Sequence, residues 1–296
     1  MTKSGFVAIV GRPNVGKSTL LNTIIGKKIA ITSDKPQTTR HRISGVYTKD
    51  NNQIVFIDTP GMHKAKDLLN RRIDKLAVSA LREVDVIVFV VDRPLGKAEE
   101  HIIKYFENIK TKVYLVINKV DNINYNKAKI DEVILSYITK YEFSGVFPIS
   151  ATNNKNVEYL LEELINNLEK GPFYYPEDSI TDQSDKTIMA EFIREKILIH
   201  TEEEVPHAVA VQIESLEYNE EYKTIDVSAI IYVERDSQKK ILIGKNGTKL
   251  KTIGTEARLD INEKFGTKTH LNLWVKVKKD WRNKLTDLNR FGYGNE

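Results

Sequence analysis

The sequence lacks the residues that several common kinds of chemistry require. Its 296 residues include no cysteine, which excludes disulfide bonds, thiolate catalysis and cysteine-based zinc sites. The six histidines are scattered, and none pairs with another at metal-ligand spacing. The longest clean apolar run, residues 86–91, is far shorter than the roughly 20 residues of a membrane-spanning helix. With only five apolar residues near its start, the chain shows no secretory signal, so we expect a cytoplasmic protein.

The net charge of +4 hides an uneven distribution. Residues 171–234 contain 15 acidic and 4 basic residues, whereas residues 235–284 contain 14 basic and 5 acidic ones. A basic block next to an acidic one favours a surface that binds a polyanion, although a solvated lysine-rich face explains such a run equally well.

The first 170 residues alternate short apolar segments with amphipathic ones. We predict strands, apolar throughout, at residues 6–10, 54–57, 84–91, 113–117 and 146–149. Helices are predicted between them at residues 68–82, 98–110 and 157–168. A hairpin turn at Asp50-Asn51-Asn52 adds one antiparallel edge strand. The fold class is therefore α/β, a doubly wound and mostly parallel sheet.

A break at Gly171–Pro176, followed by an acidic stretch, ends this alternation. We place the first domain at residues 1–171, a linker at 172–186, a smaller α+β domain at 187–281 and a C-terminal tail at 282–296. In the second domain we expect the order α-β-β-α-α-β, with the last two helices formed by residues 248–265 and a break near Gly254.

A phosphate-binding loop is the strongest motif. Residues 11–18 read GRPNVGKS and match G-x-x-x-x-G-K-[ST] between a predicted strand and a predicted helix. The glycines let backbone N–H groups converge on phosphate oxygens at a helix N-terminus. Lys17 would reach the β- and γ-phosphates, and the Ser18 hydroxyl would bind Mg²⁺. The predicted phosphate-binding residues are Gly11, Arg12, Pro13, Asn14, Val15, Gly16, Lys17, Ser18 and Thr19.

Polar residues follow three further strands and point to guanine. Asp58 could hold Mg²⁺ through water, and the Gly61 N–H could meet the γ-phosphate. Asp121 can accept hydrogen bonds from the N1–H and 2-amino groups of guanine, which adenine does not offer. Lys119 would lie along the base, Asn118 would tie this loop to the phosphate loop, and Ser150-Ala151 would place a backbone N–H near the guanine O6. The sequence therefore predicts a GTP site.

A second motif, the G-x-x-G loop of residues 244–247, lies in the basic block. The motif alone arises often by chance, so its context decides. In a KH domain such a loop lets the backbone of single-stranded RNA approach closely, and nearby lysines neutralise its phosphates. A domain that serves only as a protein interface is the alternative. The predicted RNA-binding residues are Lys239, Lys240, Gly244, Lys245, Asn246, Gly247, Lys249 and Lys251.

Apolar residues alternate with polar ones and a tryptophan over residues 270–277. One face of this strand is core, and the other mixes Trp274 with lysines. Trp274 could extend an RNA surface by stacking, or it could pack on a neighbouring segment, and the sequence does not choose.

Together, these motifs, the segment PQTTRH at 36–41 and the segment EEEVPH at 202–207 resemble the Era family of bacterial GTPases. The resemblance covers essentially the whole chain and implies a type II KH domain after a GTPase domain. It implies a monomer that binds the 3′ end of 16S ribosomal RNA and acts in 30S subunit assembly, with a further peripheral membrane association for which no lipidation motif is visible. GTP would order residues 36–42 and reposition the KH domain.

The resemblance also assigns roles near the γ-phosphate. A switch threonine completes the Mg²⁺ shell in related GTPases; Thr38 and Thr39 both qualify, and the resemblance favours Thr39. Met62 stands where Ras-like enzymes keep a water-orienting glutamine. Related GTPases with this replacement use an asparagine to hold K⁺ against the phosphates, and Asn14 stands at that position; the alternative is that Asn14 only stabilises the loop. The expected catalytic residues are Lys17, Asn14 and Thr39, and the expected metal-binding residues are Ser18, Thr39 and Asp58. A phosphotransferase or an RNA-binding scaffold with a vestigial nucleotide site are the rival functions.

Overall fold

The computed structural model describes residues 1–35, 38–61 and 67–293. Its contacts divide the chain into two compact units. The first unit holds most of residues 1–182. The second holds the chain from Gln183 onward together with Ile31–Thr38 and a short segment that ends at Arg72.

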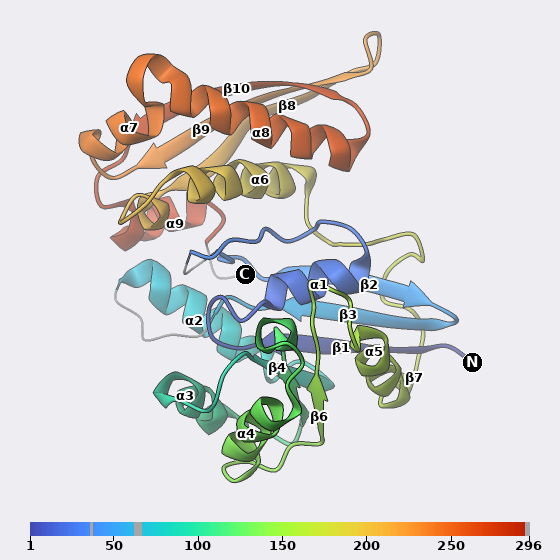
Figure 1. The fold of residues 1–296 in the computed structure, drawn as a ribbon. Coiled ribbons are helices and arrows are strands. Elements are labelled where there is room, and N and C mark those ends of the chain that lie inside the picture. The colour runs from blue at the N-terminus through green and yellow to red at the C-terminus, as the bar shows by residue number, and fades with distance from the viewer. Residues whose placement is uncertain (36–37, 62–66, 294–296) are drawn as a thin grey trace. The chain divides into compact units, whose positions relative to one another are not determined.

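The first unit is built on one sheet with the strand order β2–β3–β1–β4–β5–β6, and β7 pairs with the start of β1 (Figure 1). Its strands are β1 (Lys3–Val10), β2 (Ile43–Lys49), β3 (Asn52–Asp58), β4 (Val86–Val91), β5 (Lys112–Ile117), β6 (Gly145–Pro148) and β7 (Glu169–Lys170). Only β2 and β7 run antiparallel to their partners among the described residues. The predicted mostly parallel sheet with an antiparallel edge strand is confirmed.

Helices cover both faces of this sheet. They are α1 (Lys17–Ile25), α2 (Leu68–Ala80), α3 (Lys97–Phe106), α4 (Lys127–Ile138) and α5 (Val157–Asn166). Strand β4 is buried throughout because successive side chains enter different cores: Val88 packs with α1 and α5, whereas Ile87 and Phe89 pack with α2, α3 and α4. Double coverage leaves the carboxyl ends of the parallel strands as the open edge where polar residues gather.

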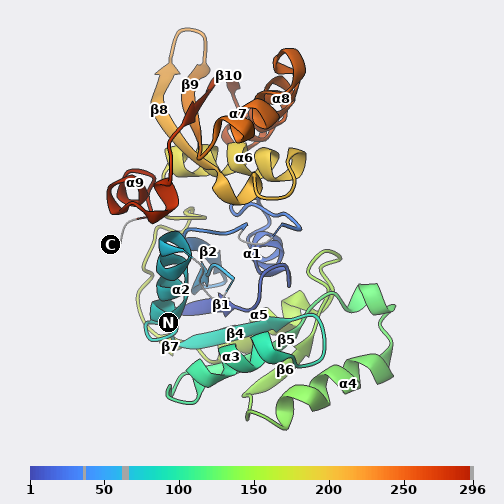
Figure 2. The ribbon, with the colours of Figure 1, turned by 90° about the vertical axis from the view of Figure 1, so that its left-hand side faces the viewer.

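The second unit is a three-stranded sheet with helices against both faces (Figure 2). Its elements are α6 (Asp185–His200), β8 (Ala210–Asn219), β9 (Thr224–Val233), α7 (Asp236–Ile243), α8 (Thr248–Phe265), β10 (Lys268–Val277) and α9 (Leu285–Arg290). The strand order is β10–β9–β8, with β10 parallel to β9 and β8 antiparallel to it. Figure 2 shows α6 and α8 on one side of this sheet and α9 on the other.

One detail of the predicted α-β-β-α-α-β order is wrong. Helix α8 continues through Gly254 without a break, and the first of the two successive helices is instead α7, which precedes the G-x-x-G loop. Gly254 allows α8 and β10 to pack closely, because an added Cβ would lie only 3.2 Å from Leu273 Cδ1 of β10. The glycine costs helix stability but lets the strand approach the helix closely.

Trp281 anchors the end of the chain to the second unit. It is fully buried, and its indole N–H donates a 2.9 Å hydrogen bond to the Ala208 carbonyl. Phe291 packs against both Trp281 and Tyr232, the latter on the sheet face opposite α6 and α8. Within the described ranges, no helix is long and apolar enough to span a membrane.

Candidate nucleotide site and nucleic-acid interface

The phosphate loop joins the end of β1 to the start of α1. Gly16 has φ +95°, and an added Cβ would collide with the Asn118 amide. That amide donates a 2.9 Å hydrogen bond to the Val15 carbonyl, while its oxygen accepts one from the Ala151 N–H at 2.9 Å. Asn118 thus links its own loop to the phosphate loop, as expected from the sequence, and it also contacts the loop after β6, which the sequence did not predict.

Lys17 lies at the first position of α1 with its ammonium turned back into the loop. Its Nζ donates to the carbonyls of Gly11 and Arg12 at 3.2 and 3.1 Å. Burial lowers the pKa of Lys17 to about 8, and the nearby Asp58 carboxylate offsets part of that shift. A buried ammonium held by two carbonyls at a helix N-terminus is preorganised to meet a phosphate anion.

Three oxygen-bearing side chains meet beside Lys17. Ser18 Oγ donates to Asp58 Oδ2 at 2.6 Å and lies 3.0 Å from Thr39 Oγ1. Asp58 is fully buried, its Oδ1 has no hydrogen-bond partner among the described residues, and burial raises its pKa to about 6. Thr38 differs from Thr39, because its hydroxyl donates to the Lys35 carbonyl at 2.6 Å.

The residues predicted to read the base follow β5 and β6. Lys119 has φ +62°, and its Nζ donates to the Asn14 carbonyl and to Asp92 Oδ2, the latter at 3.1 Å. Asp121 lies half-buried in a short 3₁₀ turn, Val120–Ile123, directly after this lysine. Ser150 and Ala151 are both buried at the end of β6. The structure brings the four predicted strand-end elements to one edge of the sheet.

Arg12 is in the predicted loop, but its side chain is already held by carboxylates. Its Nη2 lies 2.5 Å from Asp92 Oδ1 and its Nε 2.8 Å from Glu99 Oε1. Burial alone raises the pKa of Asp92, but the bonds and charges of Lys119 and Arg12 outweigh it and leave the pKa below its ordinary value. The side chain of Arg12 therefore braces the phosphate loop against Asp92 and Glu99.

Asp92 is a site residue that the sequence reasoning missed. It follows the last residue of β4 directly, at the same edge as the other strand-end residues. The signal was available, since a carboxylate immediately after a buried parallel strand lies at the binding edge of the sheet. Of the remaining predicted residues, Gly61 lies against Pro13, and Asn14 has φ +65°. Met62 lies outside the described residues.

In the second unit, the G-x-x-G loop forms the N-terminus of α8. Gly244 has φ +74° and Gly247 φ +76°, so both glycines adopt backbone conformations that side chains disfavour. An added Cβ on Gly247 would meet nothing within 4 Å, so the space outside this residue is open. Lys240, Lys245 and Asn246 are exposed around the loop.

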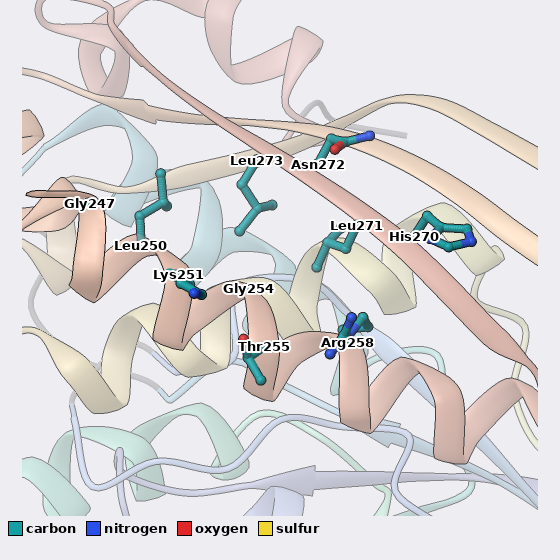
Figure 3. A pocket seen from close by; sticks show the side chains of 10 residues that line it. All are labelled: Gly247, Leu250, Lys251, Gly254, Thr255, Arg258, His270, Leu271, Asn272 and Leu273. Atoms are coloured by element: carbon teal, nitrogen blue, oxygen red, sulfur yellow. The ribbon is translucent and has the colours of Figure 1, made fainter.

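A groove of about 460 Å³ runs from this loop between α8 and β10 (Figure 3). Of the predicted RNA-binding residues, Gly247 and Lys251 line it; Lys239, Lys240, Gly244, Lys245, Asn246 and Lys249 belong to α7, the loop and the start of α8 outside the lining. The sequence reasoning missed the other lining residues: Leu250, Gly254, Thr255, Arg258, His270, Leu271, Asn272 and Leu273. A strand edge beside a helix creates this groove, which periodicity in one element does not reveal.

Comparison with known proteins agrees with this geometry. A family described as 50S ribosome-binding GTPase matches residues 6–119, and the KH domain family matches residues 204–282. GTPase Era of Clostridioides difficile (strain 630) is 49% identical over the full length of both chains.

The chain belongs to the Era family of GTPases.

Two Era crystal structures are similar to the whole chain. One contains Era with MgGDPNP and nucleotides 1506–1542 of 16S ribosomal RNA, at a TM-score of 0.95 and 38% identity with both chains fully covered. The other contains a variant of Aquifex aeolicus Era bound to GDP·AlF₄⁻, at a TM-score of 0.95 and 38% identity over 99% of this chain and all of the other. The predicted family, a GTPase domain followed by a KH domain, is confirmed.

Proposed function

We propose that this Era-family chain hydrolyses GTP with Mg²⁺ at the phosphate loop and binds the 3′ end of 16S ribosomal RNA during 30S subunit assembly. The observation that carries the proposal is the contact among Ser18, Thr39 and Asp58 beside Lys17. A site that had lost nucleotide binding would not need to retain these three side chains in contact. The Era structure with MgGDPNP and the 16S segment supports both halves.

The donors beside Lys17 fit a magnesium ion. Asp58 offers a buried carboxylate oxygen without a partner, and Ser18 and Thr39 offer hydroxyl oxygens, the hard ligands that Mg²⁺ selects. Held by these residues, Mg²⁺ would supply positive charge that offsets the negative charge developing during phosphoryl transfer. Lys17 holds the phosphates, and the backbone N–H groups of the loop orient them.

We propose that Asn14 helps to hold a K⁺ ion, which would supply positive charge next to the phosphates. Its left-handed backbone turns the segment so that its carbonyl accepts from Lys119, at the point where the phosphate loop meets the base-binding loop. GTP turnover in K⁺ and Na⁺ buffers tests this. Faster turnover in K⁺ that disappears in Asn14→Ala supports the ion, and equal rates in the two buffers would sink it.

We propose further that GTP controls RNA binding by ordering residues 36–42, of which residues 36 and 37 lie outside the described ranges. In the second unit, Arg194 of α6 donates to the Thr38 carbonyl, and the Thr32 N–H donates to Glu195 at 2.9 Å. The next residue, Thr39, lies beside Ser18 in the first unit. A shift of Thr39 on binding an ion would therefore be transmitted to Thr38, which is hydrogen-bonded to α6. Equal RNA affinity with GDP and with a non-hydrolysable GTP analogue would remove this coupling.

Gly247→Asp tests the RNA half of the proposal, and α8 offers a matched control. Gly247 and Gly266 cap the two ends of this helix, both have positive φ, and both have open space around an added Cβ. Aspartate at either position strains the backbone, but only at position 247 does it place a negative charge where RNA passes. We expect crosslinking in cells to give a peak near the 3′ end of the small-subunit RNA that Gly247→Asp loses and Gly266→Asp keeps.

The rival functions make other predictions. A phosphotransferase would move phosphate to an acceptor other than water. An RNA-binding scaffold with a vestigial nucleotide site would keep its RNA behaviour and nucleotide binding unchanged in Lys17→Ala. The monomeric state, the cytoplasmic location and the peripheral membrane association that the family resemblance implies stay predictions.

A further inference from the structure

Strand β10 has one face in the core and one face open. Leu271, Leu273 and Val275 belong to the core or pack against it, on the side of α8. The alternate residues form a ladder on the opposite face, and all of them are exposed: Lys268, His270, Asn272, Trp274 and Lys276. Trp274 is 49% exposed, and its side chain makes no ring contact or hydrogen bond with any described residue.

The ladder is continuous with the groove. His270 and Asn272 belong to the groove lining, and Figure 3 shows Asn272 on the side of β10 away from Leu271 and Leu273. This is the outer edge of the sheet, because β9 lies on the other side of β10. Trp274 follows Asn272 on the same face, about 7 Å further along the strand. An extended ligand that leaves the groove along β10 meets the indole ring next.

The charge of the strand suits a polyanion. Residues 268–279 contain four lysines and no acidic residue. The neighbouring strands differ, because Asp226 of β9 pairs in register with His270 and with Glu217 of β8. These carboxylates repel a phosphate backbone from the middle of the sheet and leave β10 as the favourable path.

We propose that Trp274 is a stacking platform for the RNA base just outside the groove, and that Lys276 neutralises the adjoining phosphate. A KH groove holds about four nucleotides, and aromatic rings bind further bases irrespective of sequence. The inference rests on the proposed RNA binding and extends its footprint onto the outer face of β10.

The two tryptophans of the chain make the platform observable without any substitution. Trp281 is fully buried and hydrogen-bonded, so a quencher in solvent and a stacked base both act on Trp274. The experiment titrates the full chain, with a non-hydrolysable GTP analogue, with RNA of nucleotides 1506–1542 of 16S ribosomal RNA. We expect RNA to quench part of the tryptophan fluorescence. The fluorescence that remains should be less accessible to quenching by iodide than in the chain without RNA. Trp274→Phe should lose the RNA-dependent quenching.

Affinities separate stacking from charge. We expect Trp274→Ala to raise the Kd about tenfold without changing the slope of log K against log salt, and Trp274→Phe to recover most of the affinity. Lys276→Gln should instead reduce that slope by about one. The matched control is Tyr222→Ala in the β8–β9 turn, which removes an aromatic ring that is 69% exposed and should leave the Kd unchanged. Thermal unfolding of each variant checks its fold.

The outcomes are distinguishable. If Gly247→Asp abolishes binding while Trp274→Ala binds like the unchanged chain and no quenching occurs, the groove stands and the platform is wrong. If the unchanged chain does not bind this RNA, the proposed function fails and the platform fails with it. If Trp274 fluorescence changes with protein concentration in the absence of RNA, a second copy of the chain covers the ring, and the inference is overturned.

Discussion

Thr38 and Thr39 are neighbours in the chain, yet their contacts belong to different units. The Thr38 carbonyl accepts from buried Arg194 of α6, and its hydroxyl donates to Lys35. The Thr39 hydroxyl lies 3.0 Å from Ser18, beside the buried Asp58. A single peptide bond therefore joins the KH unit to the site proposed for Mg²⁺.

The two threonines should respond differently to removal of their hydroxyl groups. We expect Thr39→Ala to lower GTP turnover and to raise the Mg²⁺ concentration needed for half-maximal turnover by roughly 10- to 100-fold, the usual cost of weakening a metal site. Thr38→Ala, which loses only local backbone hydrogen bonds, should leave the Mg²⁺ dependence unchanged. Magnesium titrations of hydrolysis measure both, and equal effects would contradict the assignment.

Removing one partner of the buried Glu191–Arg194 ion pair should lower the free energy of unfolding. Arg194 Nη2 lies 2.5 Å from Glu191 Oε2, and both side chains are buried. Arg194→Met strands the carboxylate, so the free energy of unfolding should fall by about 3–5 kcal/mol. The double variant Glu191→Met/Arg194→Met removes both charges and should recover most of that loss in urea unfolding.

The same double variant tests the coupling. It keeps α6 packed but lacks the donor for the Thr38 carbonyl. We expect the difference in RNA affinity between the GDP state and the GTP-analogue state to shrink, while the affinity for GTP itself stays within about twofold. An undiminished difference would show that the bond to Thr38 carries no coupling.

Asp121→Asn should change the preferred base. The carboxylate is predicted to accept from the two donors of the guanine edge, and an amide offers only one acceptor there. One lost charged hydrogen bond costs about 1.5–3 kcal/mol, so GTP affinity should fall about 10- to 150-fold. Xanthosine triphosphate, which carries an oxygen in place of the 2-amino group, should gain affinity. Competition between the two nucleotides measures the switch, and uniform loss of both would argue against base readout.

Asp92→Asn should loosen both loops that Asp92 joins. It weakens the charged contacts with Arg12 and Lys119, so we expect a loss of about 1.5–3 kcal/mol in unfolding free energy and a GTP Kd about tenfold higher. Glu99→Gln is the control, because it weakens one Arg12 contact and leaves Lys119 in place.

The pH dependence follows from the lowered pKa of Asp92. A carboxyl group whose pKa is lower in the folded chain stabilises fully above its unfolded pKa of about 3.9, and that contribution disappears as the pH falls through the folded pKa. The stability difference between the unchanged chain and Asp92→Asn should therefore be constant from pH 6 to 8 and diminish only in acid.

The sequence predicted the parts of the fold that depend on strong local patterns. The apolar strands of the doubly covered sheet, and the phosphate loop between a strand and a helix, are predictable from the sequence. The hydrogen bond from Asn118 to Val15 is also predictable, because the ends of parallel strands meet at one edge of the sheet. Gly254 was misread because a helical glycine looks like a break unless the close approach of Leu273 is known. Helix α7 is short and weakly patterned, so only the surrounding fold identifies it.

The site residues that the sequence did not predict were overlooked for one shared reason. Asp92, Arg258 and His270 act through neighbours that are far away in the sequence: Asp92 contacts Arg12, while Arg258 and His270 face a groove made by two elements. Their side chains carry no motif of their own. The distinction between Thr38 and Thr39 likewise depends on tertiary contacts, because the two residues are chemically identical.

The absent side chain of Gly254 also bears on the width of the groove. The lining of the groove on β10 is as close to α8 as Leu273 and Gly254 allow, and a methyl group at position 254 would push them apart by a few tenths of an ångström. Such a change alters no charge and no hydrogen bond. A substitution at position 254 would therefore widen the groove through a single steric step and leave the charges around it unchanged.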